Sequence, residues 1–371
     1  QNLLDTHWGT SYHALTDRFS IFFGCEARKI SMKTAVKVIA INLIGVLIIL
    51  ALHEGFLFAL IRHPDLLRKC PMGLRNSIGY LYNNGDRRII QFSPDCARFD
   101  ENLGYTLNPG QCVFSGNEFS NTYRINSAGL RDDESSLDHP EIIVTGDSFA
   151  MGWGVEQEET YAQLLERKTR LRVLNAAISS YGTAREMLAL RRIPTDRLRY
   201  LIIQYCENDR EENLSFYQNG NTLNTMSADQ YRQYAALDAR DKSYFPGKYL
   251  KMQIEKRVKE SGQKKSQASK PVDLDEVDLF INAITQSGVN LKSVQLIVFV
   301  MNGRIADDNR AFPAALKKKI ADGNYPDYIR RMIVLDLSDA LNESNFYVLD
   351  DHMNRSGHEI VVDVLYQTLS R

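Results

Sequence analysis

Four apolar runs of this chain are each followed by residues that take part in acyl-transfer chemistry. A serine hydroxyl is a weak nucleophile until a base takes its proton, and an imidazole is the usual base. A carboxylate beside the imidazole fixes its tautomer, and N–H donors stabilise the oxyanion of the tetrahedral intermediate. The residues, with the run that each follows, are Ser148 (after residues 142–145), Gly182 (after 173–176), Asn208 (after 200–205) and Asp350, Asp351 and His352 (after 346–349).

These residues predict a nucleophile, a base and an acid. Ser148 lies in the stretch Gly-Asp-Ser-Phe and is the expected nucleophile, with His352 as its general base. Asp350 is the expected orienting acid, and Asp351 is the alternative. Gly-Asp-Ser alone is also ordinary turn chemistry, so the assignment depends on all four runs together.

The same residues supply donors for an oxyanion hole. We expect the backbone N–H groups of Ser148 and Gly182 and the side-chain amide of Asn208 to point at the developing negative charge. A glycine at position 182 lets the backbone approach a substrate closely. Gly182 as a plain turn residue and Asn208 as a helix cap remain the structural alternatives.

A parallel β-sheet is the element that brings such residues together. Continuous apolar runs that alternate with helix-length segments are typical of a parallel sheet covered on both faces. The ligand site of such a sheet lies at the carboxyl ends of its strands. The expected strands are residues 142–145, 173–176, 200–205, 296–300, 333–335 and 346–349.

With these motifs in place, the chain resembles the SGNH (GDSL-type) hydrolases over roughly residues 140–371. The family's four blocks are a Gly-Asp-Ser turn, a Gly, an Asn-Asp and an Asp-x-x-His near the C-terminus. Ser148, Gly182, Asn208 and His352 match these blocks in order. Residues 103–105 and 129–131 also resemble the lead-in of membrane-anchored bacterial-type members. The resemblance implies an α/β fold, a three-layer α/β/α flavodoxin-like parallel sheet, and serine esterase or acyltransferase chemistry without metal or cofactor, often on acetyl groups of sugars.

The acid block departs from the family pattern. The family places its Asp three residues before the His, where this chain has Leu349. Asp350, two residues before His352, is therefore the first candidate and Asp351 the second. The changed spacing requires a different backbone path and leaves the identity of the acid more open than that of the base.

Residues 38–61 predict a membrane-spanning helix. The run is apolar apart from Asn42 and the pair His53-Glu54, and about 20 apolar residues match the thickness of the hydrocarbon core. A buried core helix is one alternative, and a cleaved signal peptide is another that lacks a small-x-small cleavage site. We expect an uncleaved, single-pass anchor in the cell membrane with a periplasmic or extracytoplasmic catalytic domain. Basic residues flank both ends, so they do not fix the orientation.

Changes in composition predict four segments. Residues 1–31 are of uncertain origin because Met32 would serve as a natural start before an anchor, and residues 32–61 form that anchor. Residues 62–140 have the turn signals of a small β-rich preface. Residues 141–371 form the hydrolase domain, with a polar insertion at about 214–275.

Charge and cysteine content exclude some partners. Lys+Arg 45 against Asp+Glu 46 gives a net charge of −1, which offers no case for nucleic acid. The five cysteines include no C-x-x-C pair, which argues against a structural zinc site. Cys96 and Cys112 bracket a turn-rich segment, and a disulfide between them is left open. Cys206 is expected to be a buried small hydrophobe.

Three functions follow from the sequence. The first is a membrane-anchored serine esterase that cleaves acyl, above all acetyl, esters of a glycan or a small molecule. The second uses the same site as an O-acyltransferase on a polysaccharide, beside a multi-span membrane partner. The third is a non-catalytic glycan-binding protein on a hydrolase scaffold, for which the unusual Asp spacing is the only support.

Overall fold

A computed structural model describes residues 31–263, 275–303 and 309–370 of the chain. Its contacts divide the chain into two units, residues 1–53 and 54–371. The described part of the first unit is the beginning of helix α1 (Met32–Arg62), whose side chains up to His53 are almost all exposed. Among the described residues, α1 is the one helix long and apolar enough to cross a membrane.

The centre of the second unit is a parallel sheet of five strands. Its strands are β5 (Ile142–Thr145), β6 (Val173–Asn175), β7 (Tyr200–Tyr205), β8 (Gln295–Val300) and β9 (Ile333–Val334). They lie in the order β6-β5-β7-β8-β9, and every pair is parallel. This is the flavodoxin-like order: the chain passes from β5 to β6 on one side and then returns to add β7, β8 and β9 on the other side. The predicted α/β class is confirmed.

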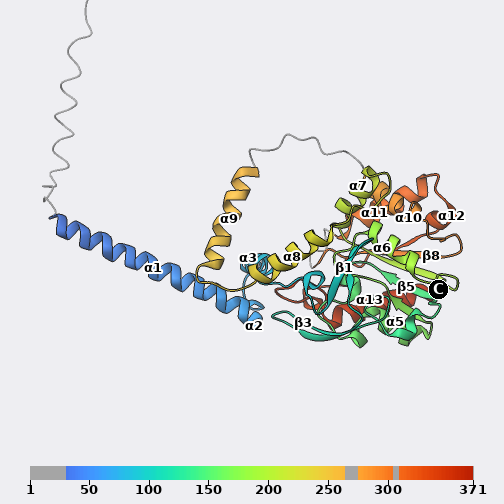
Figure 1. Ribbon diagram of the computed structural model, residues 1–371, viewed down its shortest axis with the longest axis horizontal. Helices are drawn as coiled ribbons and strands as arrows, with labels where there is room; N and C mark the ends of the chain where they lie inside the picture. The colour runs from blue at the N-terminus through green and yellow to red at the C-terminus, as the bar shows by residue number, and fades with distance from the viewer. Residues whose placement is uncertain (1–30, 264–274, 304–308, 371) are drawn as a thin grey trace, which may run out of the picture. The chain divides into compact units, whose positions relative to one another are not determined.

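Helices cover both faces of this sheet, which makes three layers (Figure 1). Alternate strand residues point to opposite faces. Ile143 therefore packs with the helices α6 (Thr183–Ala189), α10 (Glu276–Thr285) and α11 (Ala311–Asp322). Its neighbours Ile142 and Val144 pack on the other face, with α5 (Tyr161–Thr169) and α13 (Arg355–Leu369).

Two hairpins precede the sheet. The first pairs β1 (Ala97–Asp100) with β2 (Gly104–Leu107), and the second pairs β3 (Gly110–Ser115) with β4 (Ser120–Ile125). A disulfide joins Cys96 to Cys112, with Cα atoms 5.4 Å apart, and so ties the two hairpins together. The stretch that was expected to be β-rich also holds the helices α2 (Pro64–Leu67) and α3 (Met72–Gly85).

The last two turns of α1 pack inside the second unit. Leu57 and Ile61 are buried with Tyr82 of α3 and with Tyr249, at the start of α9 (Lys248–Gln263). Glu54 is buried as well. The expected membrane segment, residues 38–61, is therefore corrected, because its second part contacts protein. The exposed apolar stretch is residues 32–53, about 33 Å of helix, which matches a bilayer core.

Two other expectations differ from the structure. Residues 346–349 form no strand; Phe346 makes one isolated bridge to Met353, and the segment is a loop beyond the last strand. The expected polar insertion begins inside α7 (Asp209–Gln218) and contains α8 (Ala228–Asp241) and α9, while residues 264–274 lie outside the described part. The remaining elements are α4 (Ser148–Met151), α12 (Asp327–Arg330) and the 3₁₀ turns η1 (Ile90–Phe92), η2 (Glu134–Leu137), η3 (Gln157–Glu159), η4 (Leu190–Arg192) and η6 (Glu343–Asn345).

Candidate active site

A sharp turn after β5 presents Ser148. Gly146 has φ +150°, and a Cβ there would lie 2.6 Å from Oε1 of Gln204 and 2.7 Å from Cβ of Ala150, so only glycine fits. The backbone N–H of Asp147 donates to Oε1 of Gln204 at 3.1 Å. The Asp147 carboxylate caps α4 by accepting the N–H of Phe149 at 2.9 Å. Ser148 is thus the first residue of α4, and the bond to Gln204 of β7 fixes the backbone directly before it.

Ser148, His352 and Asp350 form one line of hydrogen bonds. His352 Nε2 lies 2.7 Å from Ser148 Oγ, and His352 Nδ1 lies 2.5 Å from Oδ1 of Asp350. All three are buried, Ser148 being 9% exposed and Asp350 0%. One ring nitrogen therefore faces the hydroxyl that must lose its proton, while the other is fixed by a carboxylate. This is the geometry of a nucleophile, a base and an orienting acid.

Asp350 is held in its charged form. Burial alone would raise the pKa of this carboxyl, but the charge and hydrogen bond of His352, together with the charge of Arg87, lower it below its ordinary value. A second donor, the hydroxyl of Tyr82 in α3, reaches Oδ2 of Asp350 at 3.2 Å. Asp350 can thus stabilise an imidazolium on His352 at neutral pH.

Glu118, in the turn between β3 and β4, fixes the backbone that carries Asp350. Its carboxylate accepts the N–H groups of Val348, Leu349 and Asp350 at 2.7, 2.8 and 3.0 Å. Burial raises the pKa of Glu118, although these three N–H groups act in the opposite direction. Three successive backbone donors on one side chain determine the path of the loop immediately before His352.

Asp351, the alternative acid, points elsewhere. Its backbone is left-handed, with φ +71°, a conformation that Asp adopts more readily than most residues. Its carboxylate lies against Gly303, whose added Cβ would meet Asp351 Oδ2 at 2.8 Å. The structure brings Asp350, rather than Asp351, to His352. The left-handed residue turns the chain between the two, which makes the Asp-x-His spacing workable.

Aromatic rings enclose the base. The indole of Trp153 stacks on the His352 ring at 4.9 Å between centroids, and Phe149 lies at 4.6 Å. Trp153 and Phe149 are themselves 3% and 8% exposed. The imidazole therefore has little freedom to rotate away from Ser148, and water has little access to it.

Arg131 fixes the loop that follows α4. It is fully buried, and its guanidinium donates to the carbonyl oxygens of Met151 at 3.2 Å, Val155 at 2.5 Å and Gly152. The same group lies 3.6 Å above the ring of Tyr123. Burial lowers the pKa of Arg131. A cation among carbonyl oxygens at the end of α4 complements the negative end of that turn and determines where Trp153 lies.

The oxyanion-hole expectation needs a correction at Gly182. Its backbone N–H donates to Oε1 of Glu212 at 3.0 Å and is not available to a substrate oxygen. A Cβ at Gly182 would meet Cβ and Oε1 of Glu212 at 3.0 Å, so the close approach that needs a glycine here is to Glu212. Asn208 is exposed just before α7, three residues beyond the end of β7. For the N–H of Ser148 we find no acceptor among the described residues.

Buried acids surround the turn at Gly182. Burial is the largest cause that raises the pKa of Asp147, Glu186, Asp209 and Glu212, and repulsion from neighbouring carboxylates adds to it for Glu186 and Asp209. Within the described part of the chain, no three such residues are arranged to hold a metal ion. Cys206 lies near two of these acids, Asp147 and Asp209. Its thiol is only partly exposed, and burial raises its pKa.

His358, in the last helix α13, has a structural role. Its Nδ1 accepts the N–H of Tyr161 at 3.2 Å, and the two rings stack at 5.5 Å. Burial, with the nearby charges of Arg131 and His352, lowers the pKa of His358 to about 3. The imidazole is therefore neutral and takes no part in proton transfer.

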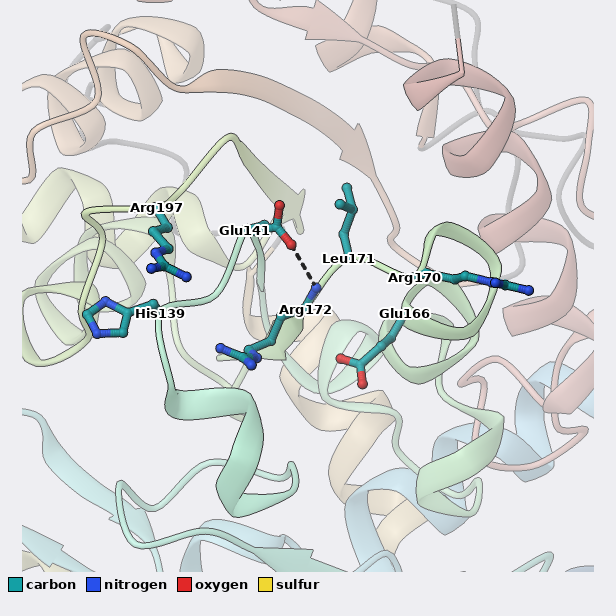
Figure 2. Close-up of a pocket in the computed structure, with 7 residues that line it drawn as sticks. All are labelled: His139, Glu141, Glu166, Arg170, Leu171, Arg172 and Arg197. Atoms are coloured by element: carbon teal, nitrogen blue, oxygen red, sulfur yellow. Dashed lines mark hydrogen bonds between the residues drawn. The ribbon is translucent and has the colours of Figure 1, made fainter.

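A charged pocket of about 680 Å³ lies at the other end of the strands from Ser148 (Figure 2). Glu141 comes directly before β5, and Arg172 comes directly before β6, so this pocket is at the amino ends of the strands. The N–H of Arg172 donates to the Glu141 carboxylate at 3.3 Å. Ser148 follows the carboxyl end of β5, so this pocket is not the place for the chemistry. The other lining residues are His139, Glu166, Arg170, Leu171 and Arg197.

The sequence could suggest some of these residues and not others. Ser148 was found from the end of a strand, and Asp350 and His352 from the apolar run 346–349, although that run forms no strand. Glu118 and Tyr82 were not found, because their role depends on contacts with residues more than 200 positions away. For Arg131, the sequence shows only that residues 129–131 form a Gly-Leu-Arg stretch, which does not indicate a buried guanidinium.

Comparisons with known proteins give structural neighbours only. No family model and no curated protein matches the sequence. A member of the lipolytic protein G-D-S-L family from Veillonella parvula is 12% identical, with 62% of this chain and 98% of that chain covered and a TM-score of 0.36. The structure of a carbohydrate esterase is 13% identical, with 62% and 68% covered and a TM-score of 0.33. At these values the likeness says nothing of activity, which we infer from the site itself.

Proposed function

We propose that this chain is a membrane-anchored serine esterase that cleaves acyl esters through an acyl-enzyme. The observation that carries the proposal is the line from Ser148 through His352 to Asp350, with distances of 2.7 and 2.5 Å. A non-catalytic scaffold has no need of a buried serine aligned with a buried histidine and an ionised acid. The hydrogen-bonded Asp-x-His segment also counts against the non-catalytic alternative.

The geometry supports a two-step reaction. His352 takes the proton of the Ser148 hydroxyl as its oxygen attacks the ester carbonyl, and Asp350 stabilises the imidazolium. The backbone N–H of Ser148, with the side-chain amide of Asn208, stabilises the oxyanion. His352 then gives the proton to the leaving alcohol. A second acceptor, activated by the same base, releases the acyl group and restores Ser148.

A small acyl group suits the enclosed nucleophile. Ser148 is 9% exposed, and Phe149 and Trp153 pack around the base beside it. We therefore propose an acetyl or similarly short ester, carried by a glycan or a small alcohol. For the anchor we propose residues 32–53, with the second unit in the periplasm or another extracytoplasmic space, where a disulfide between Cys96 and Cys112 persists.

Purified protein tests the proposal with a fluorophosphonate probe and p-nitrophenyl acetate. Ser148→Ala and His352→Ala should abolish labelling and turnover, and Asp350→Asn should lower kcat by about 10³–10⁴-fold, as expected when the base loses its orienting acid. Asp351→Asn is the matched control, because its carboxylate faces Gly303, and it should retain kcat within a few-fold. Equal labelling of wild type and Ser148→Ala would overturn the proposal.

The acyl acceptor is tested in the same assay. Water and a sugar hydroxyl resolve the same acyl-enzyme, so an esterase releases acetate at a rate that a glycan acceptor does not change. If the glycan gains acetyl groups while the release of acetate falls, the reaction is O-acyl transfer and not hydrolysis. It would also favour a multi-span membrane partner as the acyl donor.

A further inference from the structure

Glu54 of α1 caps the first turn of helix α9. Glu54 follows directly on residues 32–53, and its carboxylate accepts the N–H groups of Tyr249 and Leu250, at 3.1 and 3.0 Å. These are free backbone donors of the first turn of α9, which a carboxylate caps well. Lys248 adds a buried ion pair with Asp86, at 2.8 Å.

One face of α9 packs against α3. The Met252 side chain occupies the space beside Gly85, where a Cβ would lie 2.8 Å from its Sδ. The Lys256 ammonium lies 4.1 Å from the centre of the Tyr80 ring. This face of α9 therefore contacts α3.

Another side of α9 carries two aliphatic side chains that the described residues leave exposed. Ile254 and Val258 are four residues apart, so they lie on one side of the helix, and they are 64% and 65% exposed. Two large aliphatic side chains one turn apart are an unusual feature of a helix surface that only meets water. In Figure 1, α9 meets α3 near its start and then runs clear of the strands.

Basic residues flank this apolar pair. Lys251 and Arg257 stand three residues before and three residues after Ile254, on the two sides of the apolar stripe. A separate groove of about 590 Å³, on the side of α9 that faces Tyr80 and Gly85 of α3, is lined by Lys251, Lys256 and Lys259, with Glu255 as its one acidic residue. Over its whole length, α9 has five Lys or Arg and two Glu. Aliphatic side chains between long basic ones match the boundary between acyl chains and phosphate groups.

We propose that α9 lies on the membrane surface and binds anionic phospholipid, with Ile254 and Val258 among the acyl chains. Glu54, which caps α9, follows directly in sequence on the apolar stretch 32–53, so the start of α9 is tied to the first residue after that stretch. The proposal rests on the anchor of the proposed function and not on the catalytic site.

Tryptophan quenching by brominated lipid tests the proposal on the full chain. Ile254→Trp and the matched control Val113→Trp, a β3 residue that is also 64% exposed, are reconstituted in nanodiscs. We expect dibromo-phosphatidylcholine with phosphatidylglycerol to quench the emission at position 254 at least twofold more than that at 113. Equal quenching would overturn the proposal. Emission at 254 that is blue-shifted but unquenched would overturn it too, in favour of a protein partner.

Charge reversal tests the anionic part. Lys251→Glu with Arg257→Glu, in the Ile254→Trp background, should lower quenching in phosphatidylglycerol discs at least twofold and have little effect in discs of phosphatidylcholine alone. An unchanged signal in the anionic discs would contradict binding to phosphates. Flotation with liposomes tests the anchor separately, and a chain that fails to float contradicts the inference as well. p-Nitrophenyl acetate turnover by the same samples reports the catalytic proposal independently.

Discussion

Replacing Glu118 by Gln isolates the clamp that holds the acid of the candidate triad. The carboxylate binds three consecutive backbone N–H groups, those of Val348 through Oε1 and of Leu349 and Asp350 through Oε2. Gln has nearly the same shape and keeps one oxygen. It can still accept the two bonds at Oε2, but its amide presents a donor to the N–H of Val348.

The size of the effect follows from these bonds. A hydrogen bond to a charged group contributes about 1.5–3 kcal/mol and a neutral one about 0.5–1.5 kcal/mol, so two bonds that become neutral lose about 2 kcal/mol together. The contact of two donors, the new amide and the N–H of Val348, adds about 1–3 kcal/mol. Relief of the buried charge of Glu118 offsets part of this sum. A net cost of about 2 kcal/mol corresponds to about 30-fold in the ratio of ordered to displaced loop.

The assay separates positioning from folding. For Glu118→Gln we expect kcat on p-nitrophenyl acetate to fall by about 10–30-fold with little change in KM, because the substrate does not touch Glu118. Urea unfolding of the same samples reports global stability, and the protein should remain folded at the assay temperature. A kcat within twofold of wild type would refute the role of Glu118 in placing Asp350. An equal loss in Glu118→Gln and in a variant of comparable stability elsewhere would refute it too.

Three further changes test other parts of the structure. His358 has a pKa of about 3 when folded and 6.5 as its reference, so the unfolded chain binds the proton first and acidification destabilises the fold. Wild type should therefore lose about 2 kcal/mol more stability between pH 7 and 5 than His358→Asn in urea titrations, and equal losses would contradict a buried neutral imidazole. Breaking the disulfide by Cys96→Ser with Cys112→Ser opens a loop of 16 residues and should cost about 3 kcal/mol, seen as a lower urea midpoint, whereas reductant should leave the double variant unaffected. Tyr82→Phe removes one donor to Asp350, so kcat should fall about fivefold at constant KM; an unchanged kcat would show that His352 suffices to hold the acid.

The sheet was predictable because its signal is local. Residues 142–145 and 200–205 are mainly apolar runs, and both form strands within the expected limits. Burial on both faces of a parallel sheet requires such runs, so the sequence of each strand reports its environment directly. Residues 346–349 are also apolar but form no strand. A run that is apolar because it packs against helices cannot be distinguished by its sequence from a buried strand. Leu349 is buried against the end of α1 and α3, not in the sheet.

The end of the predicted membrane segment differs from the expectation for the same reason. Leu57, Leu60 and Ile61 are apolar, and hydropathy alone cannot distinguish a lipid from a protein partner. The informative residue is Glu54, a carboxylate that would be costly in the hydrocarbon core and is instead buried as the cap of α9. In this chain, Glu54 is the residue at which the burial of α1 within protein begins.

The acid of the candidate triad depends on contacts that no local pattern records. Asp350 lies two residues before His352 and still reaches its imidazole, and Asp351 between them has a left-handed backbone with φ +71°. That left-handed residue has an energetic cost, which Glu118 offsets by binding the three N–H groups before it. Glu118 comes from the hairpin of β3 and β4, and Tyr82 comes from α3. The segments before the sheet therefore contribute to the candidate site, and a chain truncated to the sheet and its helices should lack an aligned Asp350.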